Sequence, residues 1–89
     1  MYIEAMQNEK GIKSANNFEI TLNNGNRFLQ SYGEIVAMVI NGVTYIKREG
    51  LNRSLTTKKY IERFADKEKI INKKVLIEVD FNDLLTIYG

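Results

Sequence analysis

The chain lacks cysteine and histidine altogether. Without thiols it can form neither disulfides nor a thiolate nucleophile, and without imidazoles it has no base for the usual hydrolytic triads. A zinc finger is excluded as well, because its ligands come from these two residue types. Proline is also absent, so slow prolyl isomerisation cannot limit folding. Any chemistry must therefore come from carboxylates, lysines, tyrosines and hydroxyls.

Long apolar runs are missing too. The longest, IVAMVI at residues 35–40, is far too short to span a bilayer. The first ten residues have no basic segment followed by an apolar one, as an export signal would have. Isoleucine, asparagine and lysine, which AT-rich codons specify, make up 30 of the 89 residues. We therefore expect a protein of the bacterial cytoplasm with no membrane partner, encoded by a low-GC bacterium or by its phages and plasmids.

What the chain does contain is enough apolar material for one small core. Hydrophobic residues make up 44% of the sequence and charged residues 27%, the balance of an ordered globular domain. A chain of this length buries about 60 to 65% of the surface that it exposes when unfolded. No repeat, linker or low-complexity tract divides it. We expect a single domain over residues 1–89.

The first 16 residues carry only a weak pattern. Tyr2, Ile3 and Met6 could share one face of a helix that Gly11 ends, or the segment could be an edge strand. The sequence leaves both structures open.

Two hairpins are predicted next. Apolar and polar residues alternate over 18–22, and Asn24-Gly25 offers a tight turn before a strand returns over 27–32. The strand at 35–40 is apolar at both parities, which is typical of a central strand covered on both faces. A second Asn-Gly pair then turns it into a strand over 43–48.

The register of the first hairpin has two solutions. A two-residue loop would place Leu22 opposite Arg27, and a longer, bulged loop would place it opposite Phe28. Matching of apolar residues favours the bulged loop.

The second half of the chain predicts a helix, a strand and a helix. Ser54 can cap an amphipathic helix over about 55–66, and residues 73–79 form a late strand. Asp80 would cap a short terminal helix whose apolar residues follow at helical spacing, at Phe81, Leu84, Leu85 and Tyr88. The predicted fold class is α+β: a small, mostly antiparallel sheet of two hairpins plus a late strand, packed by one amphipathic helix and a short C-terminal helix.

Known catalytic patterns do not match. Neither Gly-rich phosphate loop occurs, and the acids of DFNDLL lack the glycine and glutamate of a calcium loop. Glu19, Glu34 and Glu78 could meet for glycoside chemistry, and Ser54 with Lys58 could form a nucleophile pair. Solvated strand acids and an ordinary helix cap are commoner explanations. We expect no enzyme, no catalytic residue, no metal and no cofactor.

Charge is distributed unevenly along the chain. Residues 47–74 hold ten of the 13 basic residues and four acids, whereas the rest holds three bases and seven acids. Several of these residues surround the start of the predicted helix, where backbone N–H groups and the helix dipole favour an anion. The candidate partner-binding or phosphate-binding residues are Lys47, Arg48, Arg53, Ser54, Thr56, Thr57, Lys58, Lys59, Arg63 and Lys67.

Blander explanations compete with a binding site. Acids alternate with the bases along the helix, so a solvated face laced with salt bridges accounts for the same residues. Tyr32 and Tyr45 could stack on bases, although half-buried core tyrosines are more common.

Residues 24–64 contain a further pattern, roughly S-Y-x-x-x-V-A, then N-G, then S-x-T-T-x-K-Y-x-x-x-F. Its matching positions are Ser31, Tyr32, Val36, Ala37, Asn41, Gly42, Ser54, Thr56, Thr57, Lys59, Tyr60 and Phe64. This stretch resembles a type of small, largely uncharacterised domain encoded by phages and plasmids of Gram-positive bacteria. The chain departs from that type at Glu34-Ile35 and at Leu51-Asn52. The resemblance implies a mobile-element origin and carries no known functional residues.

Short phage proteins often act by inhibiting a host machine, and by that analogy we expect a protein that binds and inhibits a host protein or ribonucleoprotein, of the anti-defence or anti-CRISPR type. The alternative is a nucleic-acid-binding accessory protein that contacts phosphates through residues 47–74. A homodimer through a sheet edge also stays open.

Overall fold

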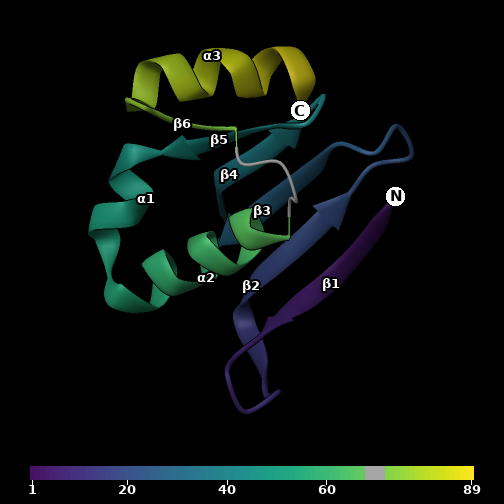
Figure 1. Ribbon diagram of the computed structural model, residues 1–89, viewed down its shortest axis with the longest axis vertical. Coiled ribbons are helices and arrows are strands. Elements are labelled where there is room, and N and C mark those ends of the chain that lie inside the picture. Colours follow the sequence, from purple (N-terminus) through teal and green to yellow (C-terminus); the bar gives the residue numbers. More distant parts are fainter. Residues whose placement is uncertain (68–71) are drawn as a thin grey trace.

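The computed structural model describes residues 1–67 and 72–89 and confirms the α+β fold class (Figure 1). Within these residues the strands form one sheet in the order β1-β2-β3-β4-β5-β6. All neighbouring pairs are antiparallel except β5 and β6, which are parallel. The elements are β1 (Tyr2–Gln7), β2 (Lys13–Thr21), β3 (Arg27–Ser31), β4 (Glu34–Ile40), β5 (Val43–Lys47), α1 (Arg48–Arg53), α2 (Leu55–Asp66), β6 (Lys73–Leu76) and α3 (Glu78–Tyr88).

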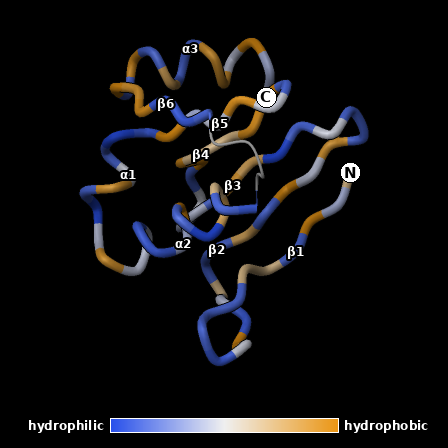
Figure 2. Tube along the Cα trace, viewed as in Figure 1, coloured by the Kyte–Doolittle hydropathy of each residue, from blue (hydrophilic) through white to orange (hydrophobic). Residues whose placement is uncertain are grey.

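The helices cover opposite faces of the sheet. Alternate residues of a strand point to opposite faces. On one face Leu29, Ala37 and Val39 pack with the buried residues of α2. On the other, Phe28 and Met38 pack with Phe81 of α3 and with half-buried residues around it. β4 is therefore covered on both sides, as its unbroken apolar run predicts, and in Figure 2 the central strands carry most of the hydrophobic colour.

Two tight turns join the central strands. Asn41 and Gly42 both have positive φ, 51° and 80°, and connect Ile40 directly to its partner Val43. Tyr32 and Gly33 repeat this geometry between β3 and β4. The left-handed pair is the geometry of a type I′ hairpin turn, which asparagine and glycine adopt readily. The predicted second hairpin is confirmed.

Both predicted registers of the first hairpin are wrong. The Leu22 N–H donates to the Asn26 carbonyl at 2.8 Å, so Leu22 faces neither Arg27 nor Phe28. Gly25, at φ 90°, takes the left-handed position of a three-residue loop, which places a bulge immediately after the turn. Apolar matching is satisfied one pair away, because Ile20 lies opposite Phe28.

The N-terminal segment is an edge strand, and the helical alternative is wrong. β1 pairs with β2 from Tyr2 opposite Thr21 to Gln7 opposite Lys13, with an irregularity between Ala5 and Gln7. The weak alternation of this segment is that of a strand with one open edge and largely exposed side chains.

The predicted α2 is confirmed with its cap. The Ser54 hydroxyl accepts a hydrogen bond from the Thr57 N–H at 3.1 Å. The α1 helix was not predicted, because its sequence REGLNR has no apolar repeat. Gly50 allows α1 to pack closely: a Cβ there would lie 3.1 Å from both Val36 and Ile61.

The boundaries of the last two elements differ from the prediction. β6 ends at Leu76, so Val79 belongs to α3 and not to the strand. α3 begins at Glu78 with Ile77 at the N-cap position and no side-chain cap, so Asp80 lies in the first turn and does not cap the helix. Phe81, at the predicted apolar position, is fully buried.

Among the described residues, no helix is both long enough and apolar enough to cross a membrane.

We predict that Gly50→Ala lowers the free energy of unfolding by about 1 kcal/mol, because crowding of Val36 and Ile61 outweighs the better helix propensity of alanine. Urea denaturation of purified protein measures the change. Asn52→Ala is the matched control, because Asn52 is exposed on the same helix. A Gly50→Ala protein as stable as the control would contradict close packing of α1.

Candidate functional site

Two of the predicted contact residues, Lys47 and Thr57, are buried. Lys47 is 2% exposed at its side chain; its ammonium pairs with Glu34 and lies 3.6 Å from Glu78. Burial is the largest single influence and opposes the charge of Lys47, but the hydrogen bond to Glu34 and the negative charges of Glu34, Glu78 and Glu49 together outweigh it and raise the pKa of the ammonium. Thr57, a residue of α2, is fully buried. Neither side chain can reach a partner.

The start of α2 is committed to internal contacts. The Arg53 guanidinium bonds Glu34 at 2.7 Å and Glu49 at 3.0 Å. These bonds raise the pKa of Arg53, and the hydrogen bond from Lys47 is the main reason that the pKa of Glu34 is lowered. The Ser54 hydroxyl is used as the helix cap. An anion at this helix end would have to displace existing bonds.

A second ion-pair cluster lies beneath the end of α2. Glu19 of β2 accepts a hydrogen bond from Arg27 at 2.6 Å and another from Lys67, and it is only 9% exposed at its side chain. Burial favours the neutral carboxyl, but the two cations outweigh burial and hold the pKa of Glu19 below its usual value. Glu19 is therefore a structural anion.

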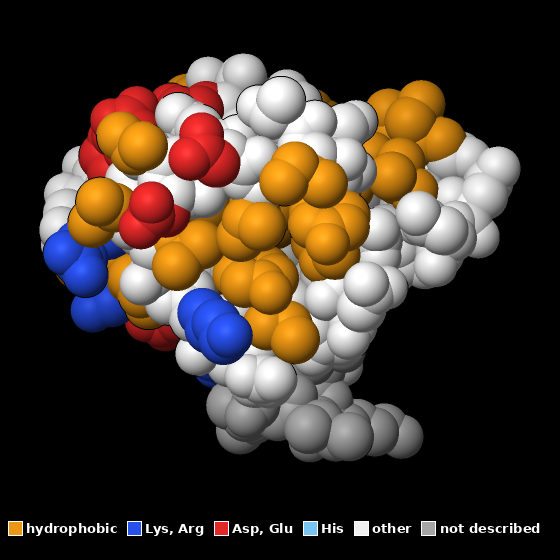
Figure 3. Space-filling model, turned by 90° about the horizontal axis from the view of Figure 1, so that it is seen from above, with side chains coloured by type: hydrophobic (Ala, Val, Ile, Leu, Met, Phe, Trp, Pro, Cys, Tyr) orange, Lys and Arg blue, Asp and Glu red, His pale blue; other side chains and the backbone are white. Residues whose placement is uncertain are grey.

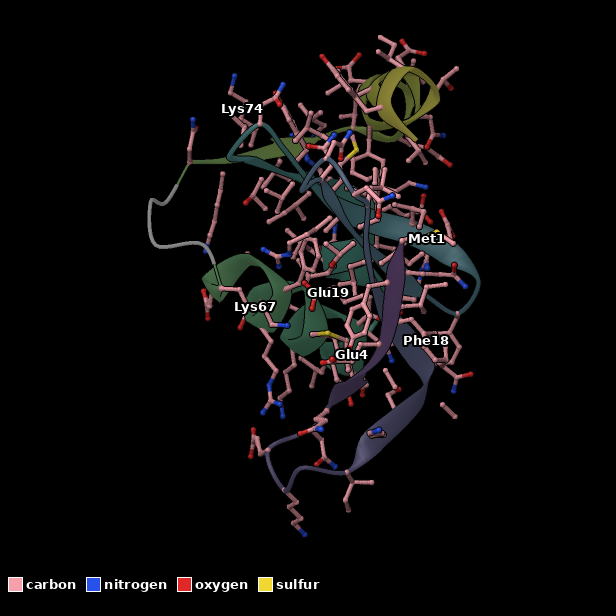
Figure 4. All side chains as sticks on the ribbon, turned by 90° about the vertical axis from the view of Figure 1, so that its right-hand side faces the viewer. Met1, Glu4, Phe18, Glu19, Lys67 and Lys74 are labelled. Atoms are coloured by element: carbon pink, nitrogen blue, oxygen red, sulfur yellow. The ribbon has the colours of Figure 1, made fainter. Side chains whose placement is uncertain are left out.

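The bases of residues 47–74 that the structure describes do not all lie on one surface. Residues 68–71 lie outside the described part of the chain. Arg48, Thr56, Lys58 and Lys59 are exposed. Lys74 pairs in register with Tyr45, whose side chain packs on the α3 side of the sheet, so Lys74 lies on the face opposite α2. Figure 4 shows Lys74 on β6, far from Lys67.

Some predicted residues do converge, in a hollow between α2 and the turn that joins β1 to β2. The hollow has a volume of about 420 Å³ and is lined from α2 by Thr56, Lys59, Tyr60 and Arg63. The turn contributes Asn8, Glu9, Lys10 and Ile12. A smaller hollow of about 240 Å³ continues along β1, lined by Glu4, Ala5, Met6, Gln7, Arg63 and Lys67. We call the two together the β1–α2 trough.

Arg63 joins the two halves of the trough. One of its Nη atoms donates to the Gln7 carbonyl of β1, which ties α2 to the sheet edge. A guanidinium carries five N–H donors, so this bond leaves others for a ligand. In Figure 4, Lys67 reaches from α2 toward the strands beside Glu19, and Glu4 lies on β1 below them.

The turn residues are the part of the trough that the sequence analysis missed. The Asn8 carboxamide accepts hydrogen bonds from the Lys10 and Ile12 N–H groups, at 2.9 and 3.0 Å, and Gly11 has φ 77°. In this hydrogen-bonded turn, Ile12 is 61% exposed to solvent. The available signal was an isolated apolar residue in an otherwise polar turn.

The other candidate groups do not come together. Glu34 and Glu78 both face Lys47, whereas Glu19 belongs to the separate cluster with Arg27. Tyr32 lies in a turn, and Tyr45 packs in the core under α3. Among the described residues, no group of three or more acids is placed to hold a metal ion.

The α3 side of the molecule has a different character. Figure 3 shows apolar side chains gathered there with acidic groups beside them. Its exposed apolar residues are Ile77, Val79, Ile87 and Tyr88, and the exposed acids of α3 are Glu78, Asp80 and Asp83. This face is opposite in charge to the trough.

Residues 1–78 match the model of a family described as "Family of unknown function (DUF8033)". The chain belongs to this family. The match includes the whole sheet, α1, α2 and every residue of the β1–α2 trough, and it ends where α3 begins. No curated protein and no solved structure matches the chain.

We predict that Glu19→Gln lowers the free energy of unfolding by about 2 kcal/mol at neutral pH. The loss is smaller than that on breaking a fully buried ion pair, because Lys67 is half exposed. The folded pKa of Glu19 lies below its unfolded value of about 4.3. Its contribution is therefore complete above that value and is lost as the pH falls through the folded pKa.

Urea denaturation between neutral and acid pH tests this. The difference in the free energy of unfolding between wild type and Glu19→Gln should disappear as the pH falls. Glu62→Gln, on the exposed side of α2, is the charge-matched control. A gap that stays constant down to acid pH would show that Glu19 does not stabilise the fold through its charge.

Proposed function

We propose that this protein is a non-enzymatic product of a phage or another mobile element that binds and inhibits a host protein or ribonucleoprotein. The observation that carries the proposal is the β1–α2 trough, where exposed cations and apolar side chains line one open hollow. Binding sites combine apolar surface with a few well-placed polar groups in this way.

Some bases of the segment are paired with carboxylates inside the fold, and Lys67 of the trough is one of them. Lys47, Arg53 and Lys73 bond carboxylates within the fold, at Glu34, Glu49 and Asp66. Within the described residues Lys10 and Lys59 have no carboxylate within ion-pair distance, and both line the trough. Charge without an internal partner is available for a ligand.

Nucleic acid is the second candidate, and the same ion pairs weigh against it. Phosphate-backbone binding needs several exposed cations in a row, and each contact adds to the salt dependence of the affinity. In this chain the carboxylates of Glu4 and Glu9 also line the trough, so its cations do not form the long uninterrupted series that a phosphate backbone needs. A protein surface with mixed charge suits such a lining better.

The mobile-element origin rests on the resemblance of residues 24–64 to phage and plasmid domains. Inhibition follows from the same analogy, because short proteins of this kind commonly act by occupying a host surface. An interface of ordinary size takes about 800 Å² from each partner, and the whole surface of this chain is 5580 Å². Such an interface would cover about one seventh of that surface.

We predict that Lys59→Glu abolishes capture of a host partner while Lys58→Glu preserves it. The two lysines are adjacent and exposed on α2, but only Lys59 lines the trough. The measurement is a pull-down from nuclease-treated lysate of a Gram-positive host, followed by an activity assay of the purified partner with each variant.

The proposal is supported if wild type and Lys58→Glu both capture a stoichiometric host protein and inhibit it, and Lys59→Glu neither captures nor inhibits that protein. Loss of the partner after nuclease treatment favours the nucleic-acid alternative. Equal capture by both variants would remove the trough from the function.

A further inference from the structure

The cations on the α2 side of the trough form a regular row. Lys59, Arg63 and Lys67 are spaced four residues apart, and such residues lie on one face of a helix. Consecutive members of the row are therefore separated by about 6 Å along the helix axis. All three line the trough.

The row runs alongside β1 in the opposite direction. Lys67 and Arg63 line the hollow with residues 4–7, and Arg63 bonds Gln7. Lys59, nearer the start of α2, lines the hollow with residues 8–12. The two hollows therefore follow one another between β1 and α2, with Arg63 lining both.

The spacing of the row fits one kind of ligand closely. In an extended chain, alternate side chains project to the same side about 6.6 Å apart. Carboxylates at alternate positions of an extended segment can therefore each meet one cation of α2. Consecutive carboxylates cannot, because neighbouring side chains point to opposite sides.

The far end of the trough adds an apolar contact. Ile12 is 61% exposed and borders the same hollow as Tyr60 and Lys59. Its position in a hydrogen-bonded turn gives it no core to pack into, so its apolar side chain is placed for a ligand. A leucine-like residue at one end of the acidic segment would bury it.

We infer that the trough recognises an extended acidic segment of a protein partner, with two carboxylates at alternate positions against Lys59 and Arg63 and an apolar residue against Ile12; Lys67 stays paired with Glu19. This inference rests on the proposed function, because it names the part of the partner that enters the site. Because Glu19 neutralises Lys67, the lining has three other cations against two carboxylates, and this positive balance complements such a segment.

Two isomeric synthetic peptides test the inference. Both contain the same glutamates, serines and one terminal leucine, but in one the glutamates alternate with serine and in the other they are consecutive. We expect wild-type protein to bind the alternating peptide about tenfold more tightly, measured by calorimetry and by shifts of the Ile12, Lys59 and Arg63 amide signals.

Protein variants locate the contacts without touching the core. Lys59→Glu should lower the affinity for the alternating peptide at least about tenfold, whereas Lys58→Glu should leave that affinity unchanged. Ile12→Ser should lower the affinity for the peptide that contains leucine. It should not change the affinity for a peptide in which serine replaces the leucine, because only Ile12 and the leucine make the apolar contact.

Several results would overturn the inference. Equal affinity for the two isomers would mean that only net charge matters, and no detectable binding of either would mean that the trough takes another ligand. Tighter binding of oligothymidylate or of inorganic polyphosphate would assign the row to phosphates, and dimers formed through the trough would assign it to a second copy. The proposed function would survive the first two results if host-partner capture still depends on Lys59.

Discussion

The buried carboxylate of Glu19 is the interaction on which the site depends. It lies on β2 beneath α2 and is bonded both by Arg27 of β3 and by Lys67 at the end of α2. Arg27 also donates to the Phe64 carbonyl at 2.9 Å and lies 4.6 Å from the centre of its ring. A charge this well buried keeps its ionised form only while both cations stay in place. The cluster therefore connects the end of α2 to β2 and β3, beside one wall of the trough.

Local chemistry made about half of this arrangement predictable. The β4 run, the Asn41-Gly42 turn and the Ser54 cap are each encoded within a few residues, and all three occur as predicted. The register of the first hairpin depended on which position Gly25 takes in the loop, a choice that apolar matching alone does not make. α1 has no periodic signal, because its place is set by the contact of Gly50 with Val36 and Ile61, which lie on other elements.

The trough could not be predicted for a related reason. Its two walls are separated by more than 40 residues of sequence and meet only because β1 folds back along β2 and α2 crosses the sheet. The basic residues of α2 were visible in the sequence, but nothing local distinguished Lys59 from Lys58. The charge count of residues 47–74 was misleading, because Lys47 and Arg53 form ion pairs with Glu34 inside the fold.

Internal pairing also determines how the site can recognise anything. Charges that are neutralised within a few ångströms contribute little field beyond the Debye length, which is about 8 Å at physiological ionic strength. The protein is therefore a poor long-range attractor of polyanions, despite its formal net charge of +2. Selectivity has to come from contact inside the trough, where Lys10 and Lys59 keep their charge available and Ile12 adds apolar surface. A ligand that offers only charge would leave Ile12 exposed, and one that offers only an apolar side chain would leave the cations without a partner.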